Sequence, residues 1–265
     1  MRFKTLTLFL AIQLLSFLVW KTMSETAPAM AVEPAQNTHA VSEEQRIAPD
    51  FAVRNFDQSR SDLNTVQKQD INAALNRLPA AHSATVKNIV LDYKADASRG
   101  LGGNNLIILR ASGVAEGELI GVLIHEIGHN VDYGYLSPKK LQKESEFKDG
   151  SYPLYVTDAS LDFYRICWQN EKTMKKTVSN LDFVSGYAMT DPFEDFAETY
   201  TYYVLHNADF KALTAESPKL AAKYRFMQYR VFGGIEFETG NGKIHANNRS
   251  WDTTILSYDL DKFLG

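Results

Sequence analysis

The residues His125-Glu126-Ile127-Gly128-His129 combine two imidazoles and a carboxylate at a spacing that suits a metal site. In a helix, positions four residues apart lie on one face, so His125 and His129 can direct ring nitrogens toward the same ion. Glu126 then stands beside the attacking water. This HExxH pattern predicts zinc binding and metal-assisted hydrolysis. The alternative is that both histidines are ordinary helix residues with satisfied hydrogen bonds.

The sequence around the motif predicts a helix that begins near Val114 to Glu116, with an acidic first turn. Gly121 and Gly128 would be costly in an exposed helix, so we expect them to pack closely against a sheet or another helix. Apolar residues recur at three- and four-residue spacing and form the expected buried face: Leu119, Ile120, Leu123, Ile124 and Ile127.

A catalytic zinc usually takes three protein ligands, so a third must come from elsewhere in the chain. The extended pattern HExxHxxGxxH needs glycine at position 132 and histidine at 135, whereas this chain has Asp132 and Tyr135. That class is excluded, and Asp132 is expected to make polar bonds at the helix end.

A second predicted helix begins with Asp191 as its cap and Pro192 in its first position. Glu194 and Glu198 share one face of this helix. One carboxylate would complete the metal ligands, and another four residues later would orient a ligand histidine. The alternative is a solvated acidic face, but aromatic neighbours favour a largely buried helix: Phe193, Phe196 and Tyr200.

These motifs, together with Ser185-Gly186-Tyr187-Ala188, resemble the zincin metallopeptidases of the anthrax lethal factor type over residues 105–206. In that family a tyrosine seven residues before the glutamate ligand faces the zinc, and Tyr187 stands seven residues before Glu194. The resemblance implies an α+β zincin-like fold, in which a small mixed sheet packs on the active-site helix and the C-terminal half is mostly helical.

The resemblance also implies roles for the site residues. One Zn²⁺ per chain is held by His125, His129 and Glu194, while Glu126 is the general base. Tyr187 stabilises the oxyanion, and Glu198 orients a ligand histidine. Residues 131–181 have no match in the family pattern and are expected to carry substrate specificity.

Composition sets the broad class of the protein. The chain has 265 residues, of which 45% are hydrophobic, and a net charge of -4. We take residues 51–265 as one catalytic domain. The charge gives no reason to expect a nucleic-acid partner, because such binding usually needs a basic surface. The single cysteine, Cys167, stands among apolar and aromatic residues and is expected to be a buried structural thiol.

The N-terminus has the pattern of a targeting segment. Arg2 and Lys4 precede an uncharged run, residues 5–20, and Ala29-Met30-Ala31 matches a signal-peptide cleavage site. We expect residues 1–31 to be a signal peptide, so that the protein is secreted, periplasmic or extracellular. An uncleaved membrane anchor is the alternative. Residues 32–50 read as a flexible linker or an inhibitory pro-segment, in which His39 is expected to be solvated.

Other elements follow from local patterns. A helix is expected over Ser61 to Leu78, with Ser61 as its cap, and another is expected from Ser217-Pro218 to Val231. Strands are expected over Val86 to Tyr93 and Leu106 to Leu109, joined by a turn at Gly100 to Gly103. The buried face of the first helix is expected to contain Leu63, Val66, Ile71, Leu75 and Leu78.

The remaining segments carry structural expectations. Residues 106–109 could offer a sheet edge on which a peptide substrate pairs. His206 and His245 lie outside any ligand pattern and are expected to be structural or exposed. Residues 251–265 could cover the core or bind a partner.

The expected function is that of a secreted zinc metalloendopeptidase acting on a peptide or protein substrate. Two alternatives remain open from the sequence: a catalytically silent zinc-containing binding protein, and a zinc amidase acting on cell-wall material.

Overall fold

The computed structural model of the chain describes residues 52–55, 61–94, 98–103, 105–137, 143–240 and 249–265, with side chains described from residue 65 onward. The predicted signal segment, the linker, His39 and His245 lie outside these residues. Within the described ranges, no helix is long and apolar enough to span a membrane.

A four-stranded mixed sheet forms one half of the fold. Its strands follow the order β1-β2-β4-β3, with β1, β2 and β4 parallel and β3 antiparallel to β4. Alternate side chains of β2 and β4 are buried on one face of the sheet, as expected from the period of two along a strand. The strands are β1 (Ala52–Asn55), β2 (Asn88–Asp92), β3 (Gly100–Gly103) and β4 (Leu106–Arg110).

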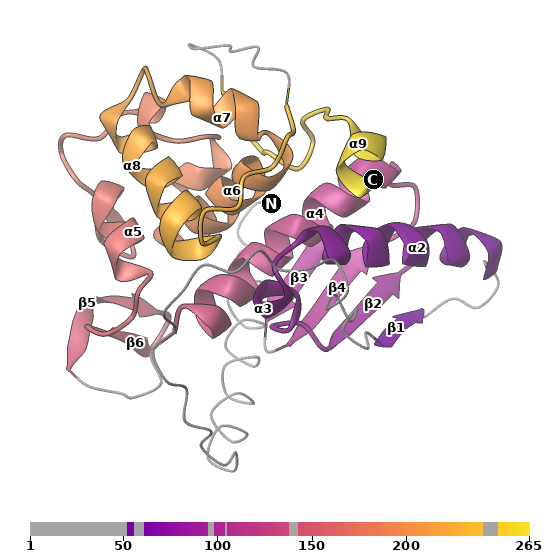
Figure 1. Cartoon of the computed structure of the whole chain (residues 1–265). Coiled ribbons are helices and arrows are strands. Elements are labelled where there is room, and N and C mark those ends of the chain that lie inside the picture. Colours follow the sequence, from indigo (N-terminus) through magenta and orange to yellow (C-terminus); the bar gives the residue numbers. More distant parts are fainter. Residues whose placement is uncertain (1–51, 56–60, 95–97, 104, 138–142, 241–248) are drawn as a thin grey trace, which may run out of the picture.

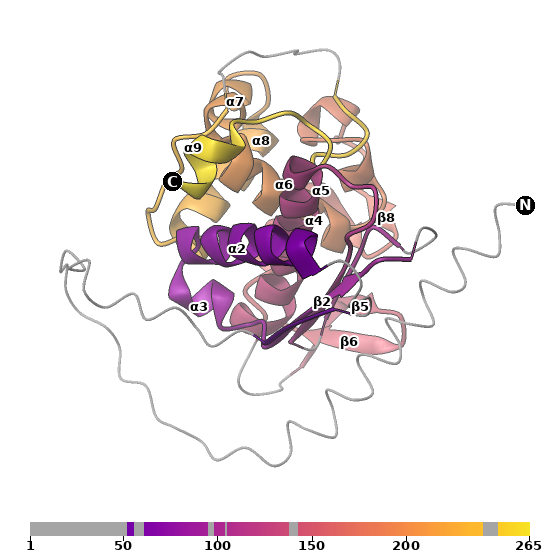
Figure 2. The ribbon, with the colours of Figure 1, turned by 90° about the vertical axis from the view of Figure 1, so that its right-hand side faces the viewer.

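The long helices of this half lie on the same side of the sheet (Figure 1, Figure 2). The helix α4 packs on β3 and β4, and α2 lies beside α4. The chain leaves α4 through one turn of π-helix without a break. The elements are α2 (Ser61–Arg77), α3 (Ala80–Ser83), α4 (Glu116–Asn130) and the π-helical turn η3 (Val131–Tyr135).

The C-terminal half is mostly helical, which confirms the predicted α+β class. Its strands form two hairpins, β5 (Glu144–Asp149) with β6 (Tyr152–Tyr155) and β7 (Trp168–Asn170) with β8 (Thr173–Met174). Its helices are α5 (Leu161–Cys167), α6 (Pro192–Leu205), α7 (Asn207–Leu213), α8 (Pro218–Phe226) and α9 (Leu260–Leu264). Short helical turns are η4 (Asn180–Asp182), η5 (Tyr187–Met189) and η6 (Met227–Val231).

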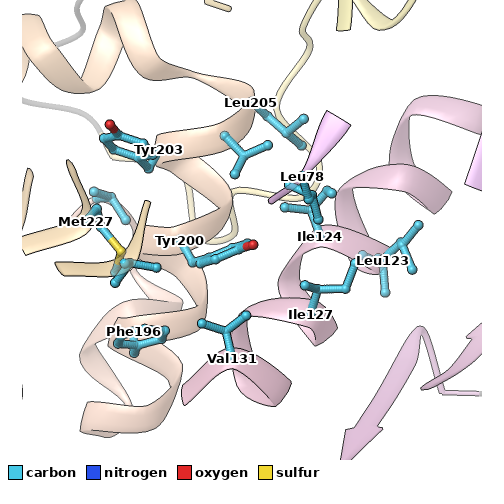
Figure 3. Close-up of a cluster of buried hydrophobic side chains, with 14 of the residues drawn as sticks. Leu78, Leu123, Ile124, Ile127, Val131, Phe196, Tyr200, Tyr203, Leu205 and Met227 are labelled. Carbon is cyan, nitrogen blue, oxygen red and sulfur yellow. The ribbon is translucent and has the colours of Figure 1, made fainter. Parts of the chain in front are cut away.

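The two halves meet where α4 packs against α6, the most extensive contact between any two described elements. Buried hydrophobic side chains of both helices form a cluster there (Figure 3). Ile127 of α4 and Val131 of η3 lie near Phe196 and Tyr200 of α6, and all four side chains are buried. A Cβ atom added to Gly128 would lie 3.1 Å from the Cα atom of Ala197. The glycine therefore lets the two helix backbones come into contact, as its position in the sequence predicts.

Gly121 packs as closely, but against an irregular segment instead of a sheet or helix. An added Cβ atom would lie 2.7 Å from the carbonyl oxygen of Thr254. The predicted starts of α6 and α8 are confirmed as well, because Asp191 and Ser217 each accept two backbone N–H groups there. Ser61 is the first residue of α2 itself, and its side chain lies outside the described residues. Cys167 and His206 are buried, in agreement with structural roles.

Three expectations are wrong. Residues 100–103 form the strand β3 instead of a turn, so the glycines are part of the sheet. Residues 106–109 lie between β2 and β3, so β4 is interior and has no free edge for a substrate. Val66 was expected to be buried but is 45% exposed. It stands five residues before Ile71, so it lies on a different side of α2 from the buried Ile71 and Leu75. The side chain of Leu63 lies outside the described residues.

Candidate metal centre

Three electron-rich atoms from two helices converge at one buried point. The Nε2 atoms of His125 and His129 on α4 lie 3.2 Å apart. The Oε2 atom of Glu194 on α6 lies 3.2 Å from Nε2 of His125 and 3.4 Å from Nε2 of His129. The structure thus brings together the three predicted ligands, which form a His-His-Glu cluster.

The spacing of these atoms fits a zinc ion. Ligand bonds of about 2.0 to 2.1 Å in tetrahedral geometry place neighbouring ligand atoms roughly 3.3 Å apart. Among the described residues, Glu194 Oε2 has no hydrogen-bond donor although it is buried. A buried carboxylate oxygen beside two imidazole nitrogens needs a cation or protons, and two histidines and one carboxylate are a catalytic zinc donor set.

Glu198 hydrogen-bonds the His125 ring on the side opposite to the metal position. Its Oε1 atom lies 3.0 Å from Nδ1 of His125, which leaves Nε2 directed at the metal position. Its Oε2 atom accepts the Ser185 hydroxyl at 2.5 Å and the Thr253 backbone N–H at 2.9 Å. A carboxylate behind a ligand histidine fixes the ring orientation and its tautomer.

The second histidine has no such partner among the described residues, because its Nδ1 atom is buried without a hydrogen bond. The nearby Asp132 is engaged elsewhere: its carboxylate accepts the Tyr164 hydroxyl at 2.5 Å. This confirms that Asp132 bonds at the helix end. Burial raises the pKa of Asp132 to about 7.

Glu126 is buried between α4 and the strand β3. An added Cβ atom at Gly102 would lie 2.6 Å from its Oε2 atom, and one at Gly100 would also overlap the carboxylate. Burial raises the pKa of Glu126, and positive charge on His125 and His129 would lower it. The glycines of β3 therefore make room for this carboxylate, a purpose that the sequence pattern alone did not indicate.

Tyr187 lies on η5 with its ring stacked near that of His125, at a centroid separation of 6.1 Å. Burial and the charge of Glu194 raise its pKa, so the phenol keeps its proton. Its backbone N–H donates to the carbonyl oxygen of Trp251 at 2.6 Å. The hydroxyl is thus a neutral donor close to the ligand cluster.

Residues 250–254, which we call the C-terminal strap, complete the surroundings of the site. The backbone carbonyl oxygen of Ser250 accepts the Gly186 N–H at 2.9 Å. This bond is adjacent to the one from the Tyr187 N–H to the Trp251 carbonyl oxygen. Asp252 pairs with Arg99, whose guanidinium also donates to Glu118 of α4 at 2.9 Å. No local sequence pattern indicates the strap's contacts with the site, or Ser185 as a partner of Glu198, because these contacts join residues that are not neighbours in the chain.

Two histidines on one helix and a glutamate on a second, beside a buried carboxylate, form the site of a zinc-dependent hydrolase. Comparison with protein families matches residues 115–249 to the family described as "Putative zinc-binding metallo-peptidase". The chain belongs to this family. Searches of curated proteins and of solved structures each found no match.

The family match confirms the predicted enzyme class and cofactor: the chain is a zinc metallopeptidase with a buried candidate site at His125, His129 and Glu194. A peptidase acts on peptide bonds, so the substrate class follows from the family. The roles of Glu126, Tyr187 and Glu198 stay predictions. The matched range ends at Arg249 and leaves out the strap.

Proposed function

We propose that the protein is a secreted zinc endopeptidase of the anthrax lethal factor type, with Glu126 as general base and Tyr187 as oxyanion donor. One observation carries the proposal: the convergence of His125, His129 and Glu194 within 4.8 Å, beside the buried carboxylate of Glu126. A zinc site without turnover needs neither a general base nor an open coordination position. The arrangement therefore favours an enzyme over a silent binding protein.

A zinc ion at this site supplies Lewis acidity, which lowers the pKa of water and polarises a carbonyl group. Glu126 removes a proton from the attacking water and passes it to the leaving amine. The Tyr187 hydroxyl donates a hydrogen bond to the oxygen of the tetrahedral intermediate. Glu198 keeps the His125 ring in the tautomer that binds metal through Nε2.

The substrate backbone pairs with β3 in this proposal, in place of the interior strand β4. One side of β3 bonds to β4, and no other strand among the described residues covers its second side. Its glycines project no side chains, so an extended peptide can come close to Glu126, which lies against the same strand. Main-chain pairing at a sheet edge gives affinity without sequence preference.

Likeness to the lethal factor type is supported by the place of Tyr187, seven residues before Glu194 and stacked near His125. Secretion is supported by the apolar run 5–20 and the Ala29-Met30-Ala31 site. Mass spectrometry of the exported protein should find an N-terminus near Val32. An intact Met1 in a membrane fraction would instead indicate an anchor formed by residues 5–20.

The decisive variant is Glu126→Gln, which keeps the shape of the side chain and removes the base. Zinc content should persist, while hydrolysis of an unstructured protein should fall by about 100-fold or more. Glu116→Gln is the matched control, since Glu116 lies exposed on the same helix and should keep full activity. Unchanged hydrolysis by Glu126→Gln would refute the role of the base.

A substrate screen separates the alternatives. The zinc-loaded protein is incubated with a mixed peptide library and with peptidoglycan, each with and without a chelator. Chelator-sensitive cleavage of peptides supports the proposal. Cleavage of peptidoglycan alone would indicate a cell-wall amidase, and cleavage of neither would indicate a binding protein.

A further inference from the structure

We propose that Trp251 selects the substrate, by binding an apolar or aromatic side chain next to the scissile bond. This inference rests on the proposed peptidase function. It places substrate specificity on the C-terminal strap instead of residues 131–181, where the family resemblance led us to expect it.

A line of aromatic rings leads from the metal centre to the surface. The ring of His125 stacks near Tyr187 at 6.1 Å, and the ring of Tyr187 lies 6.2 Å from that of Trp251. Exposure rises along this line, from a buried His125 to a Trp251 that is 63% exposed. Trp251 is thus the outermost ring of the line and stands next to the proposed oxyanion donor.

The backbone around Trp251 is fixed at several points. Its carbonyl oxygen accepts the Tyr187 N–H, and the N–H of Thr253 donates to Glu198. Asp252 pairs with Arg99 and accepts the backbone N–H of Thr254 at 2.7 Å. A side chain on a fixed backbone loses little entropy when it binds a ligand, so this indole is preorganised for contact.

The strap also lies next to the strand on which we place the substrate. Arg99, the partner of Asp252, comes directly before Gly100 of β3. Because the charges of Arg99 and Asp252 are paired with each other, they do not offer an isolated charge to a substrate. In this proposal, a peptide extended along β3 passes the Arg99–Asp252 ion pair and then contacts the exposed indole of Trp251.

The Trp251 indole packs directly against Gly186. An added Cβ atom there would lie 2.6 Å from the Trp251 ring, so only glycine permits this position. Exposure alone would mean little, because single exposed hydrophobic residues are common. Tyr229 is 65% exposed as well, but it lies on η6, which holds none of the site residues. Trp251 differs from Tyr229 because it lies beside Tyr187 of the site.

The test compares matched peptides with the zinc-loaded full chain. Wild-type kcat/KM should be higher for a phenylalanine or leucine peptide than for the same peptide with alanine, by about 10-fold or more. Trp251→Ala should bring this ratio close to one, and Trp251→Phe should restore much of it. Tyr229→Ala is the matched control and should keep the wild-type ratio.

A binding measurement gives a second readout that needs no turnover. In the Glu126→Gln background, the phenylalanine peptide should shift the tryptophan emission to shorter wavelength as it covers Trp251. Trp20 is replaced by phenylalanine in every sample, and Trp168 is buried and should contribute no shift. The additional change Trp251→Phe should abolish the shift.

The possible outcomes separate the two proposals. Peptide cleavage with no apolar preference, or a preference that survives Trp251→Ala, overturns the inference and leaves the proposed function intact. A chain that neither cleaves nor binds peptides overturns both. An emission shift that persists in the Trp251→Phe variant also overturns the inference.

Discussion

Lys223 donates a hydrogen bond to Asp195 at 2.7 Å, and neither side chain has any exposed surface. Asp195 also accepts the Trp168 indole N–H at 3.0 Å, and the Lys223 ammonium lies 4.1 Å from the centroid of the Phe183 ring. Burial raises the pKa of Asp195, and Lys223 opposes this shift. Because Asp195 follows the candidate zinc ligand Glu194 on α6, this buried pair anchors the helix next to the metal centre.

Breaking this ion pair should cost much stability. Lys223→Met leaves the Asp195 carboxylate buried without a cation, so the free energy of unfolding should fall by about 3 to 5 kcal/mol in urea titrations. Lys211→Met is the control, because Lys211 makes an exposed pair with Glu236 and should cost about 1 kcal/mol or less. Equal losses in the two variants would contradict a special role for the buried pair.

Glu198→Ala should weaken zinc binding without removing a ligand. The variant frees the His125 ring from its partner at Nδ1, and loss of such a partner typically lowers metal affinity by about 10- to 100-fold. Competition with a chromogenic chelator measures the change. Ser185→Ala should have a smaller effect in the same direction, since it removes one of the two bonds that hold Glu198 Oε2. Wild-type affinity in Glu198→Ala would exclude the proposed role.

Gly102→Ala should impair catalysis while zinc content is kept. The new methyl group would meet the Glu126 carboxylate, and displacement of a catalytic group by about 1 Å can cost roughly 100-fold in rate. Gly117→Ala is the control, because its Cβ atom would come no closer than 3.9 Å to a neighbour and alanine favours a helix. Steady-state kinetics and metal analysis of both variants provide the comparison. A fully active Gly102→Ala protein would show that Glu126 does not need this space.

His82 should make the apoprotein less stable in mild acid. Its Nε2 donates to the Val231 carbonyl and its Nδ1 accepts from the Tyr200 hydroxyl, both at 2.9 Å, so the ring is held neutral. Burial lowers its pKa to about 4, whereas the unfolded chain takes up the proton near 6.5. The stability from the neutral ring is therefore complete above pH 6.5 and is lost as the pH falls toward 4.

The size of this effect follows from the two pKa values. Between pH 7.5 and pH 5, His82→Gln should lose about 2 kcal/mol less stability than the wild type. Urea titrations in excess chelator measure this difference, because zinc binding then makes no contribution. Parallel pH profiles for the two proteins would contradict a buried neutral His82.

The site residues that could be predicted from the sequence are marked by patterns among residues that are close together in the chain. His125 and His129 lie one helical turn apart, and the helix that carries Glu194 is marked by the adjacent Asp191 and Pro192. Such patterns depend on neighbouring residues only. The sequence therefore predicted both helices of the site and all three candidate ligands, while the family resemblance supplied Tyr187.

The errors have the opposite cause. The glycines of β3 match a turn in local composition, and only contact with Glu126 of another element explains them as a strand. The interior place of β4 depends on strand order, which a single strand does not encode. The strap has no periodic pattern, and its bonds to Tyr187 and Glu198 arise from tertiary packing.

The strap also bears on when the chain acquires activity. Arg99 and Asp252 are separated by 153 positions in the sequence, and Glu198 and Thr253 by 55. Contacts between such distant segments form slowly, because the loop between them must close first. Until the strap docks, Glu198 and Tyr187 lack the hydrogen bonds that it provides. We therefore expect the complete site to form late in folding, after the HExxH helix, whose backbone hydrogen bonds are local.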